Sequence, residues 1–156
     1  MTVRHSLKFS LIFSAACLVL ATSPARADRC DDLAKMLVGQ ISDLKVGTVR
    51  GGEIAMTHPS AKQASLGCSS RNRTNSMTAS TDKRKPSPEF YDFLATASAL
   101  VFTIPKGDTL RGVQRCVSRT NIIRGYDIAS RYRKLDIRCQ VTKTGTRITV
   151  SREKDE

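Results

Sequence analysis

The side chains with the most chemical potential in this 156-residue sequence are its five cysteines and two histidines. Beyond residue 27 the cysteines are Cys30, Cys68, Cys116 and Cys139, and no two of them lie within four residues of each other. Zinc sites usually combine closely spaced cysteine pairs with histidines. The spacing therefore does not favour a metal site, and we expect neither a metal nor another cofactor.

The first 27 residues have the three-part pattern of a secretory signal peptide. Arg4 and Lys8 precede an uncharged apolar run from Phe9 to Thr22, and Ala25 and Ala27 place small residues before a cleavage site after Ala27. The run is shorter than the roughly 20 residues that a membrane-spanning helix needs. We expect an exported protein with no transmembrane span after cleavage, periplasmic if the source is bacterial and secreted otherwise.

Cleavage leaves four cysteines, and paired thiols persist in the oxidising compartments that exported proteins enter. Four cysteines allow three pairings. Cys30 and Cys116 fall on predicted helices, whereas Cys68 and Cys139 fall on predicted strands. We favour the disulfides Cys30–Cys68 and Cys116–Cys139, because each would tie a helix to the sheet that it covers.

His58 is the only histidine beyond the leader, so hydrolysis of the ribonuclease type would need His58 together with a carboxylate. Glu53 lies five positions earlier, and an odd separation on a strand points two side chains to opposite faces. Glu89 is a further candidate acid, but it occupies a predicted helix start. A structural place for His58, on the same side of a strand as Ile54 and Met56, is the simpler interpretation.

The charge of the chain favours anionic partners. The sequence has 26 lysines and arginines against 14 acids, a formal net charge of +12. Three basic residues belong to the leader, which leaves 23 against 14 and a net charge of +9. Such a surplus attracts polyanions without sequence specificity. Export makes a specific nucleic-acid partner unexpected, and we expect instead an anionic lipid, a polysaccharide or an acidic protein.

Basic side chains gather near the C-terminus, on the segment with the clearest alternation in the chain. Within residues 134–141 apolar side chains alternate with polar ones, which predicts a strand with one apolar and one basic face. Polar sheet faces also serve solubility alone, which is the competing explanation. The predicted anion-binding surface consists of Arg131, Arg133, Lys134, Arg138 and Arg147.

The first half of the mature chain has the pattern of a helix followed by strands. The apolar spacing predicts a helix over 29–44 with Asp28 as its cap, then strands over 46–50 and 53–57 that flank a Gly-Gly turn. A further strand is expected over 62–68. Residues 69–88 are expected to form a polar, basic loop, with 73–81 as a possible polar edge strand. The triplet 83–85 in this loop is either a solvated face or a contact for an anionic polymer.

The second half has the pattern of two helices followed by a hairpin. Ser87, Pro88 and Glu89 predict a helix start, and an apolar stripe continues to Ile104. Asp108 is expected to cap a helix over 109–119, residues 120–131 to connect, and residues 134–141 to pair with a last strand.

These elements predict a small single α+β domain over residues 28–156, with helices on one face of an antiparallel sheet and two disulfides. No nucleotide-binding, metalloprotease or serine-hydrolase motif is present. The favoured function is a non-enzymatic binding or accessory module of the cell envelope or the extracellular space, with a basic anion-facing surface. The alternative is a small secreted hydrolase that uses His58 with a carboxylate such as Glu53.

Overall fold

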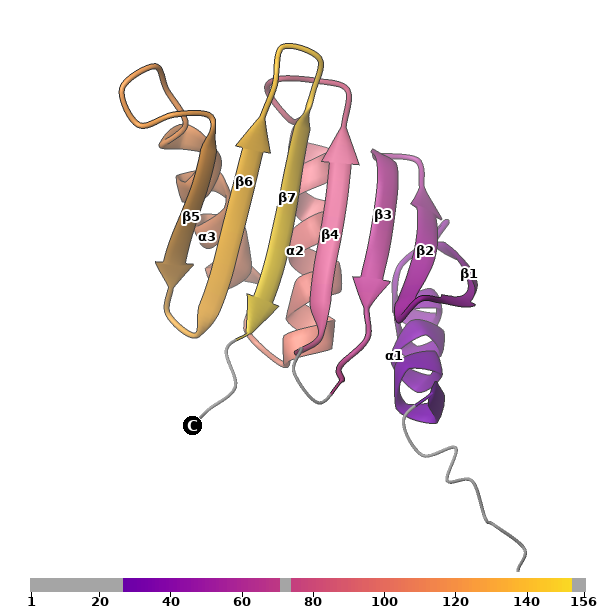
Figure 1. The fold of residues 1–156 in the computed structure, drawn as a ribbon. Coiled ribbons are helices and arrows are strands. Elements are labelled where there is room, and N and C mark those ends of the chain that lie inside the picture. Colours follow the sequence, from indigo (N-terminus) through magenta and orange to yellow (C-terminus); the bar gives the residue numbers. More distant parts are fainter. Residues whose placement is uncertain (1–26, 71–73, 153–156) are drawn as a thin grey trace, which may run out of the picture.

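The computed structural model describes residues 27–70 and 74–152. The predicted signal peptide lies outside this part of the chain apart from Ala27, so it stays a prediction. The described residues form three helices and seven strands (Figure 1), in the order α1 (Ala27–Gln40), β1 (Lys45–Arg50), β2 (Glu53–His58), β3 (Ala61–Gly67), β4 (Ser76–Thr81), α2 (Pro88–Phe102), α3 (Lys106–Ser118), β5 (Asp127–Tyr132), β6 (Leu135–Val141) and β7 (Thr146–Arg152).

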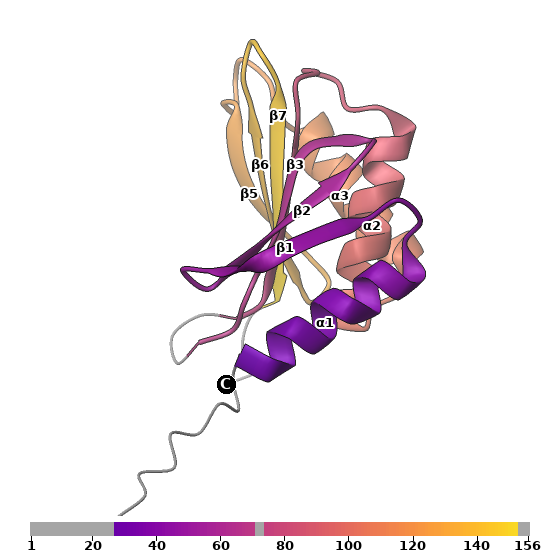
Figure 2. The same cartoon turned by 90° about the vertical axis from the view of Figure 1, so that its right-hand side faces the viewer.

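The seven strands form one antiparallel sheet in the order β1-β2-β3-β4-β7-β6-β5. The first four strands make one meander and the last three make another, and β4 joins them by pairing with β7. The three helices lie on the same face of this sheet (Figure 2). The predicted α+β fold class is therefore confirmed. An antiparallel sheet can bury one face under helices while its other face stays in water.

Local sequence signals explain where several elements begin and turn. Gly51 and Gly52 both have positive φ angles, 60° and 81°, which a two-residue hairpin between β1 and β2 requires. The Ser87 hydroxyl accepts the backbone N–H of Phe90 at 3.3 Å, and Pro88 occupies the first turn of α2. The predicted hairpin and the predicted helix start are both confirmed.

The core lies between the helices and the apolar face of the sheet. Leu66, Met77 and Ile148 from three neighbouring strands are completely or almost completely buried beneath α2, which contributes Phe90 and Leu94. Their alternation with exposed residues along each strand is the pattern that half-buried sheets require.

Both favoured disulfides are present. Cys30 on α1 is bonded to Cys68, which directly follows β3, and their Cα atoms are 5.6 Å apart. Cys116 on α3 is bonded to Cys139 on β6, with a Cα separation of 6.1 Å. Each bond ties a helix to the sheet, which is the arrangement that motivated the pairing.

The predicted loop over residues 69–88 is wrong in its middle part, which contains β4. This strand is not at an edge, because it pairs with β3 on one side and β7 on the other. Met77 and Ala79 are completely buried, whereas Ser76, Thr78 and Ser80 line the open face of the sheet. A strand with such short hydroxyl side chains has little apolar contrast, which explains why its sequence resembles a loop.

The expected connection over residues 120–131 is also wrong, because β5 begins at Asp127 and forms an edge of the sheet. The strand pairs with β6 from Asp127 to Tyr132. Ile128 is the only aliphatic residue larger than alanine in this strand, so its hydrophobic alternation is weak. An edge strand has only one neighbour and tolerates such polarity.

The boundaries of α1 and α3 differ from the predicted ones. α1 ends at Gln40, four residues early, because the chain turns at Asp43 with a φ of 60°. Asp28 lies inside α1 and does not precede it. α3 begins at Lys106, so Asp108 does not cap it; the buried Asp108 carboxylate instead accepts a hydrogen bond from Arg111.

Candidate functional site: a basic end and a histidine groove

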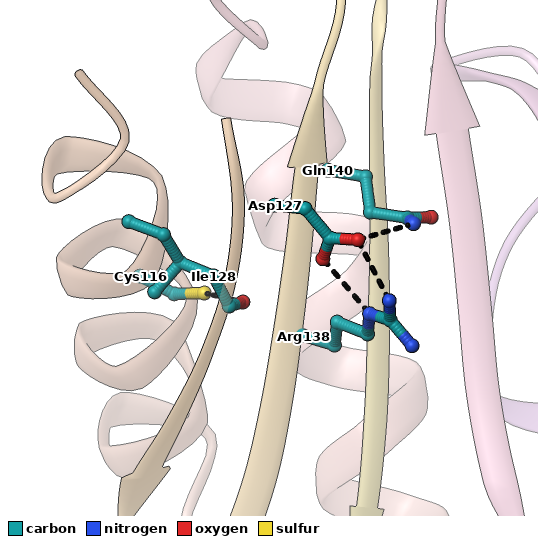
Figure 3. A network of polar contacts seen from close by, with 5 residues as sticks. All are labelled: Cys116, Asp127, Ile128, Arg138 and Gln140. Carbon is teal, nitrogen blue, oxygen red and sulfur yellow. Dashed lines mark hydrogen bonds and ion pairs between the residues drawn. The ribbon is translucent and has the colours of Figure 1, made fainter. Parts of the chain in front are cut away.

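Two of the predicted anion-binding residues are already engaged with acids on the open face of the sheet. Arg138 donates two hydrogen bonds to the Asp127 carboxylate, at 2.8 and 2.7 Å (Figure 3). Arg131 donates two to the Asp136 carboxylate, at 3.0 and 3.3 Å. Two-point pairs of this kind compensate the charge of each arginine locally, so an anionic ligand would have to compete with a carboxylate at both positions.

The Asp127 carboxylate is the centre of a small polar network. Gln140 also donates to it, at 3.0 Å. The hydrogen bonds from Arg138 and then Gln140 lower the pKa of Asp127 to about 2. Asp127 therefore stays ionised throughout the physiological pH range and keeps Arg138 neutralised.

The other three predicted residues lie at opposite ends of the sheet. Arg133 and Lys134 form the turn between β5 and β6, where the Arg133 guanidinium lies 3.4 Å from the Asp108 carboxylate. Arg147 is near the start of β7 and pairs in register with Gln140. Arg147 therefore shares the open face of the sheet with Arg131 and Arg138, so the structure brings three of the five predicted residues onto one face and leaves Arg133 and Lys134 in the turn at its far end.

Exposed cations gather instead where three loops meet, at the end of the sheet that is uppermost in Figure 1. The loops are 82–86, 119–126 and 142–145, and their sequences contain six basic residues and one acid, Asp82. We call this region the basic end; with the neighbouring Arg147, its cations are Lys83, Arg84, Lys85, Arg119, Arg124, Lys143 and Arg147.

Specific contacts hold the three loops together. The Thr146 hydroxyl donates to the Arg84 carbonyl oxygen at 2.9 Å, and the Arg84 guanidinium lies over the Tyr126 ring, 5.1 Å from its centroid. The backbone N–H of Val141 donates to the Tyr126 carbonyl oxygen at 2.7 Å. Gly145 lies so close to the backbone of Thr81 that a Cβ atom at position 145 would be 2.3 Å from the Thr81 carbonyl oxygen. The cations are therefore carried on an ordered platform.

Sequence patterns gave only partial signals for the basic end. The basic triplet 83–85 indicated either a solvated face or a contact for an anionic polymer. Tyr126 follows Arg124 in a segment that is rich in arginine. Ile122 and Ile123 belong to the predicted connection over 120–131, and no periodic pattern in that segment marks them. Their side chains are 88% and 94% exposed.

His58 lies at the end of β2, on the wall of an open groove of about 1230 Å³. Its ring stacks on Phe93 of α2, with centroids 4.2 Å apart and an interplanar angle of 7°. Nδ1 lies 2.7 Å from the Ser60 hydroxyl oxygen and accepts the Ser60 N–H at 3.3 Å. Burial lowers the pKa of His58, and a backbone hydrogen bond to Ser42 and the nearby Asp43 charge oppose this effect only in part. The imidazole is therefore neutral at pH 7.

Glu53, the predicted partner acid, does not line this groove, whereas Asp43 does and its charge acts on His58. Glu53 begins β2 and His58 ends it, so about 16 Å of strand separates them. Asp92 is paired with Lys106 at 2.7 Å. The pKa of Glu89 is lowered, mainly by a hydrogen bond with Ser87, whereas a general acid needs a raised pKa.

Within residues 27–70 and 74–152, no group of three or more histidine, cysteine, aspartate or glutamate side chains is placed to hold a metal ion. None of the helices in this part of the chain has the length and apolarity to cross a membrane. The chain matches no protein-family model, no curated protein and no solved structure.

Proposed function

We propose that this protein is an exported, non-enzymatic module that binds anionic surfaces through its basic end. The observation that carries the proposal is the convergence of loops 82–86, 119–126 and 142–145, which gathers six cations against one acid. Both disulfides are compatible with an oxidising, extracytoplasmic environment.

The other basic groups of the protein support this choice by contrast. Arg131 and Arg138 each lie against an acid of their own, which compensates their charges, whereas Arg133 shares the Asp108 carboxylate with Arg111. At the basic end, Arg84 is instead held by an aromatic ring, which leaves its charge uncompensated. A ligand with several negative charges would therefore find its strongest attraction at the basic end.

The test compares two double variants with equal loss of charge. Lys83→Gln with Lys85→Gln removes two exposed cations from the basic end, while Arg84 and its contacts stay in place. Arg50→Gln with Lys134→Gln removes two exposed cations elsewhere, from the end of β1 and from the turn between β5 and β6. Binding to heparin is measured at low salt, with protein purified after export.

We expect the wild-type protein to bind heparin and the first double variant to bind about tenfold more weakly or worse, because each cation near an anionic surface contributes on the order of 1 kcal/mol. The second double variant should bind within about twofold of wild type. Absence of wild-type binding to both heparin and anionic lipid vesicles would show the proposal to be wrong. An equal loss in both variants would assign the attraction to net charge instead of to the basic end.

A small hydrolase is the second candidate, and the favouring observation is the neutral imidazole of His58 on an open groove. A neutral imidazole is the form that can act as a general base. Against this role, Nδ1 already accepts a hydrogen bond from Ser60. If the protein is a hydrolase that uses His58, the His58→Ala variant should lose any hydrolase activity that the wild-type protein shows.

A further inference from the structure

The loop over residues 119–126 holds two isoleucines at its tip in a fixed geometry. The Asn121 side-chain oxygen accepts the backbone N–H groups of Ile123 and Arg124, at 3.0 and 2.8 Å. The Asn121 N–H donates to the Gly125 carbonyl oxygen at 3.2 Å, and Gly125 closes the turn with a φ of 85°. A closed turn of this kind keeps Ile122 from folding back toward the core.

The exposure of this pair is far outside the range of the other large apolar residues that the structure describes. Ile122 and Ile123 are 88% and 94% exposed, whereas the next value is 42%, for Val38. Single exposed apolar side chains are common on protein surfaces. Ile122 and Ile123, side by side at the tip of an ordered loop, instead form one continuous apolar patch, which we call the apolar point.

Cations lie on the same loop as the apolar point and on the two loops beside it. Arg119 and Arg124 belong to the same loop, and Arg84 reaches the loop through its contact with the Tyr126 ring. Lys143 lies on the neighbouring turn, which the Thr146–Arg84 hydrogen bond ties to loop 82–86. Apolar side chains within a basic rim match the surface of an anionic bilayer, where headgroup charges lie directly above hydrocarbon.

We propose that the partner of the basic end is an anionic lipid bilayer, and that Ile122 and Ile123 insert into its interfacial region. This inference rests on the proposed function and adds the identity of the partner. A polysaccharide supplies anionic groups but no apolar phase for the isoleucines. An acidic protein would have to offer an apolar pocket as well, and it is an outcome that the test below can reveal.

The first measurement is partitioning onto lipid vesicles. Vesicles of phosphatidylcholine with about a third phosphatidylglycerol are compared with vesicles of phosphatidylcholine alone, for wild type and for Ile122→Ser with Ile123→Ser. Val38→Ser with Val49→Ser is the matched control, since these side chains are exposed but lie on α1 and β1. We expect the isoleucine variant to partition at least tenfold more weakly onto the anionic vesicles, while the valine control and heparin binding change by less than twofold.

The second measurement uses the absence of tryptophan from the sequence. Ile123→Trp introduces a single indole at the loop tip, and Val49→Trp places one on β1 as a control. Anionic vesicles should shift the emission of the Ile123→Trp variant to shorter wavelength, and brominated lipids should quench it. The emission of the Val49→Trp variant should not change.

The possible failures are distinguishable. If wild type binds neither heparin nor anionic vesicles, both the proposed function and this inference are wrong. If heparin binding depends on Lys83 and Lys85 but the isoleucine variant partitions like wild type and the Ile123→Trp emission does not respond, only the inference is overturned. A purified acidic protein that needs the isoleucines, in the absence of vesicle binding, would identify the partner as a protein and overturn the bilayer assignment.

Discussion

At the scale of single residues, Asp127 compensates the charge of Arg138 and so makes this arginine less open to an anionic ligand. Its carboxylate binds Arg138 with two hydrogen bonds and Gln140 with a third. Counting charges along the sequence treats Arg138 and Arg84 as equals, but the first is neutralised by a neighbour and the second is not. Whether an arginine on the sheet is open to a ligand therefore depends on whether an acid on the neighbouring strand already binds its guanidinium group.

His58 gives a prediction about pH at this scale. Its folded-state pKa lies below the usual value near 6.5, chiefly because of burial. At pH values between the folded-state pKa and 6.5, the unfolded chain binds more protons at His58 than the folded chain does. The free energy of unfolding must therefore fall as the pH drops through 6.5. The fall levels off below the folded-state pKa.

We expect wild type to lose more stability than His58→Gln between pH 7.5 and pH 5.5, measured by urea unfolding at each pH. Proton NMR of the His58 ring should give its folded-state pKa directly, below the usual value. Parallel stability curves for the two proteins, or a ring pKa at or above 6.5, would contradict this account.

At the scale of elements, the two disulfides anchor helices that differ in how else they are held. α3 packs on β5 and β6, and Cys116 and Cys139 are both completely buried. α1 lies at the edge of the helix layer, against β1 and α2, so the Cys30–Cys68 bond carries more of its attachment.

Replacing Cys30 and Cys68 together by serine should lower the free energy of unfolding by about 4 kcal/mol, because the bond closes a long loop in the unfolded chain. Hydrogen exchange should rise in α1 before it rises in α3. Denaturant unfolding and exchange monitored by mass spectrometry would check both effects. Equal exchange in α1 of the variant and of wild type would show that packing alone holds this helix.

At the scale of the whole molecule, the pairing of β4 with β7 joins two meanders that each contain one disulfide. Six residue pairs from Ser76–Ser151 to Thr81–Thr146 form this junction, and the buried side chains of Met77 and Val150 lie along it. α2 covers the junction, since it packs on both strands. The two halves therefore share one core.

The shared core predicts a single cooperative unfolding transition. Far-ultraviolet and near-ultraviolet circular dichroism should report the same midpoint, because neither meander keeps a complete core without the other. A first transition that leaves one disulfide-bonded half folded would show that the halves are independent units.

Local patterns in the sequence were sufficient for the fold class, the disulfide pairing, the Gly51–Gly52 hairpin and the start of α2. The hairpin and the helix start depend on residues close in sequence, namely turn residues that tolerate positive φ and a capping hydroxyl. The pairing of cysteines that lie 38 and 23 residues apart followed from placing each cysteine on a recognisable helix or strand. β5 was missed and β4 was expected only as an optional edge strand, because the identity of both depends on the strands beside them more than on their own apolar content.

The candidate site was decided by the tertiary structure. The sequence by itself determined that the chain has a large excess of cations and where each lies along it. Only the folded chain brings loops 82–86, 119–126 and 142–145 together, pairs Arg131 and Arg138 with acids, and leaves Ile122 and Ile123 in solvent. The convergence of the loops depends on contacts between residues distant in sequence, whereas the Arg131 pair and the isoleucine turn form within short segments whose conformation their residue types alone do not specify.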